Sequence, residues 1–128
     1  MDYFGYGGIS LSADGSRLAV GGYGEDSNAV AIDGNATDNS VNQAGAVHVF
    51  NKVASTWNIG PYVKSLNTGI GDWFGGYNLS GYNVISLSAD GTLLAVGATS
   101  EDSSATGIGG DQTDNSFSAA GAVYLYED

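Results

Sequence analysis

The seven residues Ile-Ser-Leu-Ser-Ala-Asp-Gly occur twice in this chain, at 9–15 and again at 85–91. From Ile9 the chain aligns with itself at a constant offset until its last residue, and 25 of the 44 aligned pairs are identical. Further upstream, DYFG at 2–5 matches DWFG at 72–75 once six extra residues in the second copy are allowed for. Such a duplication requires an architecture made of equivalent units.

We divide the chain into a first repeat at 1–70 and a second repeat at 71–128. Each repeat predicts antiparallel strands. The first strand, GGISLS or VISLS, alternates apolar residues with serine and ends in the turn sequence Ala-Asp-Gly. The second strand is RLAVGG or LLAVGA. After a long loop the third strand, AGAVHVF or AGAVYLY, is apolar at both alternating sets, which favours a sheet covered on both faces.

A fourth strand is predicted around TWNIGPYVKS in the first repeat, where Pro61 restricts it to an outer edge. The second repeat stops at Asp128, at the point where its fourth strand should begin. We therefore predict an all-β protein of one complete four-stranded unit and one unit without its outermost strand. Scarce helix formers and 21 glycines agree with short strands joined by loops.

The order of motifs resembles the FG-GAP repeat, the β-propeller blade found in integrin α-subunit heads and in secreted bacterial proteins. Phe4-Gly5 and Phe74-Gly75 match the FG element. Val20-Gly21-Gly22 and Val96-Gly97-Ala98 match the GAP-like element without its proline. The resemblance covers nearly the whole chain and implies propeller blades, an extracellular or cell-surface location, and a non-enzymatic role in adhesion or scaffolding.

Integrin-type repeats carry a calcium loop between their first and second strands, but here that place holds only Ala-Asp-Gly in each repeat. One carboxylate cannot supply the six to eight oxygens that Ca²⁺ takes, so we interpret this turn as structural. The long loops at 25–43 and 101–119 offer the other oxygen ligands for a calcium ion, and no other cofactor is expected: Asp33, Asn35, Asp38, Asn39, Asp111, Asp114 and Asn115. The alternative is that these side chains cap turns.

Catalysis has little support in this sequence. The single histidine, His48, aligns with Tyr124 in a strand, which indicates a packing role, and there is no cysteine. The acidic pairs Glu25-Asp26 and Glu101-Asp102 are predicted to form a solvated rim rather than a glycosidase pair, because adjacent residues at a strand end diverge. We predict that the protein is not an enzyme.

Aromatic side chains are the remaining candidates for contact with a ligand or partner: Tyr3, Trp57 and Trp73. Tyr3 and Trp73 are equivalent residues before Phe-Gly, which favours packing between neighbouring units. The alternative is a lectin, in which aromatic faces stack on sugar rings and Asx residues bind the glycan.

The net charge and the lack of a long apolar run argue against nucleic acids and membranes as partners. A formal net charge of −11 repels phosphate backbones and anionic lipids, so no binding to nucleic acid is expected. No apolar run approaches the roughly 20 residues of a membrane helix, so no membrane insertion is expected. The N-terminal MDYFGYGG also lacks the charged and apolar regions of an export signal.

Two blades alone would each expose an apolar face, so the expected partner is the protein itself. Three or four chains could close a homo-oligomeric ring of six or eight blades. Alternatively, the unpaired edge of the last strand could accept a strand from another molecule and form a head-to-tail filament. A third alternative is that the chain is part of a longer propeller, and a protein or glycan partner is also open.

Overall fold

The structure is a computed structural model and describes residues 1–77 and 82–128. The described residues form seven strands in two antiparallel sheets and no helix, so the predicted all-β class is confirmed. No described segment forms a helix that could cross a membrane. Residues 78–81, part of the insertion in the second repeat, lie outside the described residues.

The first sheet holds four strands in the order of the chain: β1 (Phe4–Leu11), β2 (Arg17–Gly22), β3 (Ala46–Val53) and β4 (Thr56–Val63). The predicted fourth strand is present, and it lies at the edge of the sheet as Pro61 requires. The second sheet holds three strands: β5 (Ile85–Leu87), β6 (Leu93–Ala98) and β7 (Ala122–Glu127). In the described residues, no strand pairs with the outer edge of β7.

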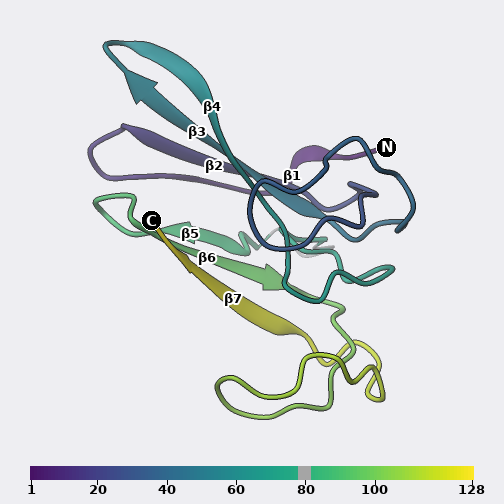
Figure 1. Ribbon diagram of the computed structural model, residues 1–128. Coiled ribbons are helices and arrows are strands. Elements are labelled where there is room, and N and C mark those ends of the chain that lie inside the picture. Colours follow the sequence, from purple (N-terminus) through teal and green to yellow (C-terminus); the bar gives the residue numbers. More distant parts are fainter. Residues whose placement is uncertain (78–81) are drawn as a thin grey trace.

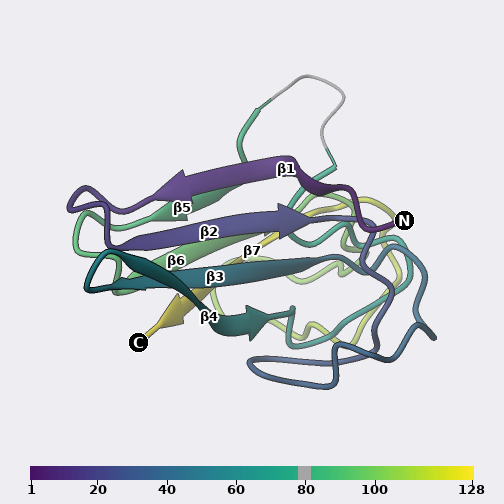
Figure 2. The same cartoon turned by 90° about the horizontal axis from the view of Figure 1, so that it is seen from above.

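The two sheets stack face to face as two layers, with β1 lying above β5 and the long loops gathered at one end (Figures 1 and 2). Between the layers lies one apolar core, to which the first sheet contributes Ala19, Val47, Val49 and Val63. The second sheet contributes Ile85, Leu94, Val96, Ala98 and Tyr124. Gly21 allows close contact here, because a Cβ atom would lie 2.2 Å from the carbonyl oxygen of Gly75.

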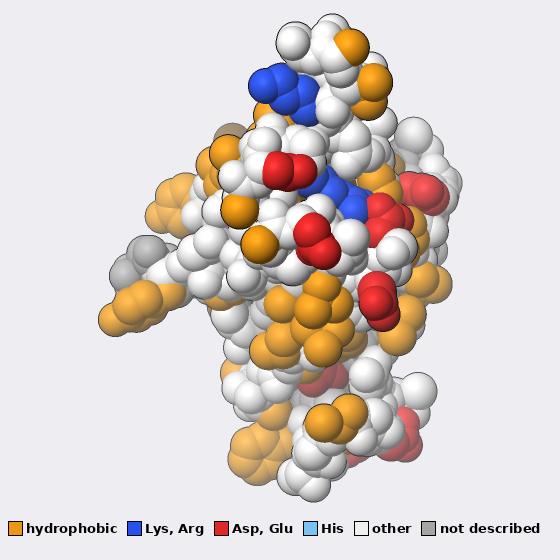
Figure 3. Space-filling view, turned by 90° about the vertical axis from the view of Figure 1, so that its left-hand side faces the viewer, with side chains coloured by type: hydrophobic (Ala, Val, Ile, Leu, Met, Phe, Trp, Pro, Cys, Tyr) orange, Lys and Arg blue, Asp and Glu red, His pale blue; other side chains and the backbone are white. Residues whose placement is uncertain are grey.

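The repeated Ala-Asp-Gly turns have the structural role predicted for them. Asp90 Oδ1 accepts hydrogen bonds from the Ser88 hydroxyl and from the backbone N–H and hydroxyl of Thr92. Asp14 makes the equivalent contacts in the first repeat, and Gly15 supplies the positive φ of 68° that the turn needs. Figure 3 looks onto this end of the molecule, where acidic and basic side chains lie close together.

Candidate interaction surfaces

The two sheets contact each other through different faces, although the repeats have equivalent sequences. Residues paired directly across strands point to the same face. By this register the second sheet turns Ile85, Val96 and Tyr124 towards the first sheet. Their counterparts Ile9, Val20 and His48 lie on the opposite, outer face of the first sheet. The sheets are therefore stacked in the same orientation, front against back.

A short segment between the sheets joins them through the backbone. Phe74 is fully buried, and its N–H donates to the carbonyl of Ala44 at 3.0 Å. The next N–H, of Gly75, donates to the carbonyl of Gly97 at 3.0 Å. The Phe74 ring packs edge-on against Tyr124 of β7. Phe74 therefore packs between the two repeats.

The outer face of the first sheet is an uncovered apolar surface. By register and ring contact it comprises Phe4, Ile9, Leu11, Leu18, Val20, His48, Phe50, Trp57 and Ile59. Five of these are exposed: Phe4 (56%), Ile9 (54%), Leu11 (56%), Trp57 (43%) and Ile59 (88%). Five of the nine line a hollow of about 250 Å³: Phe4, Leu18, Val20, Phe50 and Trp57. Soluble monomers seldom leave such a surface free.

The outer face of the second sheet is also uncovered and apolar. By register it comprises Ser86, Leu93, Ala95, Gly97, Val123 and Leu125. Val123 and Leu125 are 72% and 66% exposed, whereas their counterparts Val47 and Val49 are buried between the sheets. Small residues leave a shallow hollow of about 550 Å³ over Ala95 and Gly97.

His48 lies on the outer face of the first sheet as a packing residue. Its ring is half-buried between Phe4, with centroids 5.4 Å apart, and Tyr62, at 5.1 Å. Desolvation lowers the pKa of His48, while Glu25 and Asp2 act against that shift. The imidazole is therefore biased towards its neutral form.

Of the aromatic candidates, Tyr3 and Trp73 belong to one cluster at the loop end. Tyr3 stacks on Tyr23 at 4.8 Å, and Trp73 contacts Tyr77 at 4.4 Å. Tyr23 and Tyr77 join the two pairs at 5.0 Å. Tyr3 remains 41% exposed. Trp57 lies apart from this cluster on β4, with the Lys52 ammonium 5.9 Å from its ring centroid.

Four of the seven candidate metal ligands accept hydrogen bonds from their own loops. Asp38 Oδ1 accepts from the N–H and hydroxyl of Ser40, and Asp111 Oδ1 accepts from those of Thr113. Asn35 and Asp114 bind loop groups in the same way, Asn39 donates to the Thr37 carbonyl, and Asp33 accepts from the N–H of Tyr62. In residues 1–77 and 82–128, no three acidic or histidine side chains gather as a metal cluster. In the described part of the chain the Asn115 side chain makes no hydrogen bond, and calcium binding by these loops stays an alternative to turn capping.

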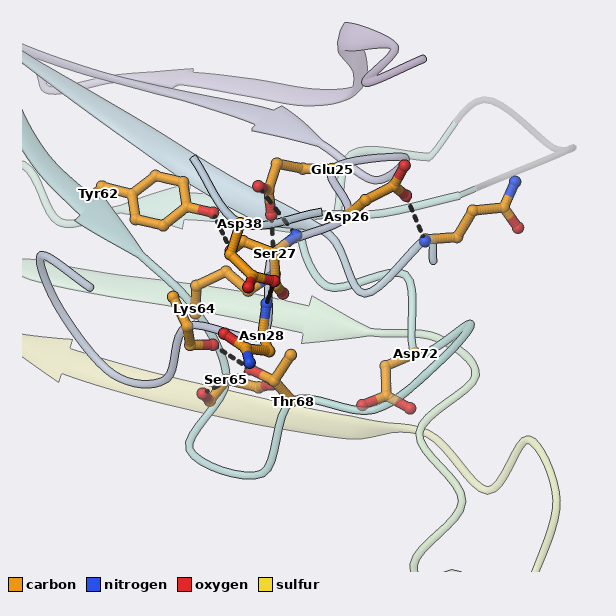
Figure 4. Close-up of polar contacts among 12 residues, drawn as sticks. Glu25, Asp26, Ser27, Asn28, Asp38, Tyr62, Lys64, Ser65, Thr68 and Asp72 are labelled. Carbon is orange, nitrogen blue, oxygen red and sulfur yellow. Dashed lines mark hydrogen bonds and ion pairs between the residues drawn. The ribbon is translucent and has the colours of Figure 1, made fainter. Parts of the chain in front are cut away.

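The predicted solvated rim is wrong for its glutamates. Glu25 is only 7% exposed, and its Oε2 lies 2.8 Å from the ammonium of Lys64, which is fully buried (Figure 4). Glu101, the counterpart of Glu25, is 2% exposed. The adjacent acidic side chains do diverge, as predicted: Asp26 points away from Glu25 and accepts a hydrogen bond from the N–H of Gln43.

Sequence reasoning missed the buried roles of Lys64, Glu25 and Phe74. A signal for the glutamates was present in the identical Glu-Asp-Ser of both loops. Lys64 is one of three basic residues and follows an apolar strand, which could have suggested a buried partner. Comparison of the chain with models of protein families, with curated proteins and with solved structures finds no match.

Proposed function

We propose that the chain is a non-enzymatic β-propeller module of the FG-GAP kind that self-assembles into an extracellular scaffold, with copies stacked front against back. One observation carries this proposal. The interface between its two sheets uses two different faces, and the equivalents of both faces remain uncovered on the outside of the molecule.

The internal interface serves as the template for contact between copies. Within the chain, Ile85 packs against Gly21, with its Cδ1 2.8 Å from the position a Gly21 Cβ would occupy. Between chains, Ile9 of one copy would pack over Gly97 of the next. A hydrogen bond from backbone to side chain would repeat too: the Leu87 N–H donates to Ser10 Oγ at 2.9 Å, so the Leu11 N–H would donate to Ser86 Oγ of the next copy.

Phe4 supports the same geometry. It is paired with Gly22 on one side, as Phe74 is paired with Ala98. Phe74 also pairs with Gly45 on its other side, whereas Phe4 has no second strand beside it among the described residues. In the stacked assembly, Gly121 of the next copy, the counterpart of Gly45, would fill that place. Phe4 would then be buried as Phe74 is.

The test uses one charged substitution on each outer face. Ile9→Asp and Val123→Asp change exposed positions, so both variants should fold, and each alone should remain monomeric in sedimentation velocity. A 1:1 mixture should form a heterodimer, because each variant retains the face that the other has lost. Val30→Asp, in an exposed loop, is the matched control and should assemble like the unmodified chain.

The masses also distinguish the forms of assembly. A discrete trimer or tetramer would indicate a closed ring, and an open size distribution would indicate a filament. A chain that stays monomeric at concentrations of about 100 μM would contradict self-assembly, since specific interfaces of standard size bind far more tightly. Dimers formed by a single variant with itself would contradict front-against-back stacking.

Carbohydrate binding is the second candidate function. The observation that favours it is the cluster of Tyr3, Tyr6, Tyr23, Trp73 and Tyr77, in which Tyr6 is 64% exposed. Exposed aromatic faces can stack on sugar rings. A glycan array screened with the unmodified chain and with Tyr6→Ala tests this function, and an array without hits would reject it.

A further inference from the structure

The two long loops fold in the same way. The Gln43 N–H donates to Asp26 Oδ1 at 2.7 Å, and in the second repeat the Ala119 N–H donates to Asp102 Oδ1 at 2.7 Å. The backbone bond from Gly45 to Glu25 likewise recurs between Gly121 and Glu101. The loops can therefore be compared residue by residue.

In the first repeat, the hollow between this loop and β3 is filled by the end of β4. The Tyr62 hydroxyl shares a hydrogen bond of 2.8 Å with Ser27 Oγ, and Val63 pairs with Ile32. Lys64 follows, and its Nζ donates to Glu25 at 2.8 Å and to the Ser27 carbonyl at 2.9 Å (Figure 4). Together these contacts hold an aromatic residue, a valine and a lysine in one extended run.

In the second repeat, the equivalent hollow is open. It has a volume of about 540 Å³ and is lined by Glu101, Ser103, Ile108, Val123 and Leu125, among others. Ile108 is fully exposed at 106%, against 47% for its counterpart Ile32. The hollow thus combines the free edge of β7 with an uncovered apolar wall.

The base of this hollow is acidic. Glu101 accepts hydrogen bonds from the Asn67 side-chain amide at 2.9 Å and from the Ser103 N–H at 3.1 Å. Within residues 1–77 and 82–128, no basic side chain forms an ion pair with it. Glu101 and Asp102 both help to raise the pKa of Asp72, behind the larger effect of burial. The negative charge concentrated here would be relieved by a cation.

We propose that this hollow beside β7 binds an extended segment of another polypeptide that presents an aromatic residue, a valine and a lysine in succession. The segment would lie antiparallel to β7, as β4 lies beside β3. Its lysine would bind Glu101, and its aromatic hydroxyl would bind Ser103. The backbone of the segment would supply the strand pairing that β7 lacks.

The probe is a synthetic peptide with the chain's own sequence from residue 59 to 66, Ile-Gly-Pro-Tyr-Val-Lys-Ser-Leu. It is titrated by fluorescence anisotropy against the Ile9→Asp chain, so that binding does not depend on the proposed self-assembly. Saturable binding is expected. Replacing the peptide's lysine with norleucine should weaken it about 10- to 100-fold, as the loss of a hydrogen bond to a buried charge predicts. Equal affinity for both peptides, or no binding, would overturn the proposal.

A second measurement tests the position and the register of the bound segment. Val47 lies directly opposite Val63 in the first repeat, so Val123→Cys should form a disulfide with a peptide carrying cysteine in place of that valine. The chain has no other cysteine. A peptide with cysteine in place of its last leucine is the control. Crosslinking that is equal for both peptides would overturn the proposed register.

Discussion

Phe74 and Phe4 hold equivalent positions in the two repeats, yet Phe74 is fully buried and Phe4 is 56% exposed. The difference arises from what lies beside each residue. Phe74 is enclosed because β6 pairs with it on one side and Gly45 of the first repeat on the other. Phe4 has β2 beside it, and in the described residues nothing encloses it from the other side. The same Phe-Gly sequence therefore lies in an internal interface in the second repeat and on an exposed surface in the first.

This pair gives the first prediction. Phe74→Ala should lower the free energy of unfolding by about 3–5 kcal/mol, because it leaves a cavity between the sheets. Phe4→Ala should cost about 1 kcal/mol or less in a monomer but should weaken self-association. Urea unfolding and sedimentation velocity on both variants check the two effects. Equal destabilisation by both substitutions would contradict the difference in burial.

The second prediction concerns the buried ion pair of Glu25 and Lys64. Glu25→Gln should destabilise the fold by about 3–5 kcal/mol, because it leaves the ammonium without its counter-ion. Glu101→Gln is the matched control and should cost only about 1 kcal/mol, since the carboxylate it replaces has hydrogen bonds but no ion pair. Thermal and urea unfolding measure both, and a Glu25→Gln effect no larger than the control would argue against a structural role for the pair.

The third prediction is loss of stability in acid. Hydrogen bonds from nearby side chains and N–H groups lower the pKa of Asp14, Asp38 and Asp111, and that of Asp90 to about 2. A lowered carboxyl pKa contributes stability above the unfolded value of about 3.9 and loses it as the pH falls through the folded value. The urea midpoint should therefore fall between about pH 4 and pH 2. Asp72 has the opposite effect on stability. Burial raises its pKa, so protonating it as the pH falls favours the folded state.

Asp90→Asn provides the control for this effect. The amide keeps an oxygen that can accept the turn's hydrogen bonds but does not titrate. Its urea midpoint should fall less steeply over the same range of pH. If the variant and the unmodified chain lose stability with the same slope, the Asp90 turn does not contribute to the acid sensitivity.

The fourth prediction is that the fold loses stability as the pH falls below about 6.5. A lowered histidine pKa means that the buried state of His48 prefers the neutral ring, so stability is lost as protons are added below the unfolded pKa. The urea midpoint should therefore fall between about pH 6.5 and pH 5. His48→Tyr, which introduces the residue found at Tyr124, should remove this dependence in urea unfolding from pH 8 to 5. An equally steep dependence in the variant would assign it to another group.

The fifth prediction concerns calcium. Adding millimolar Ca²⁺ should leave the melting temperature unchanged, because carboxylates such as Asp38 and Asp111 already accept hydrogen bonds from their own loops. Any ligand that binds only the folded state raises the midpoint with concentration. A saturable increase with Ca²⁺, absent with Mg²⁺, would contradict this prediction and assign the loops a metal site.

The strands could be predicted from the sequence because their signals are local. Alternation at Ile9 and Leu11, the Ala-Asp-Gly turns and the edge position of Pro61 depend only on neighbouring residues. The buried ion pair could not be predicted in the same way, because Glu25 and Lys64 are far apart in the chain and Glu25 begins a mostly polar loop. Whether an apolar strand face is covered depends on the sheet beside it, so Val47 and Val123 could not be distinguished.

The backbone bonds of Phe74 and Gly75 have a consequence for how the protein unfolds. The Phe74 N–H donates to Ala44 of the first repeat and the Gly75 N–H to Gly97 of the second, so this segment cannot leave either repeat without breaking a main-chain bond. The two halves should therefore melt in a single cooperative transition. In native-state hydrogen exchange, amides of β2 in the first repeat and β6 in the second should share one opening free energy. A single shared opening free energy would mean that the two repeats form one folding unit.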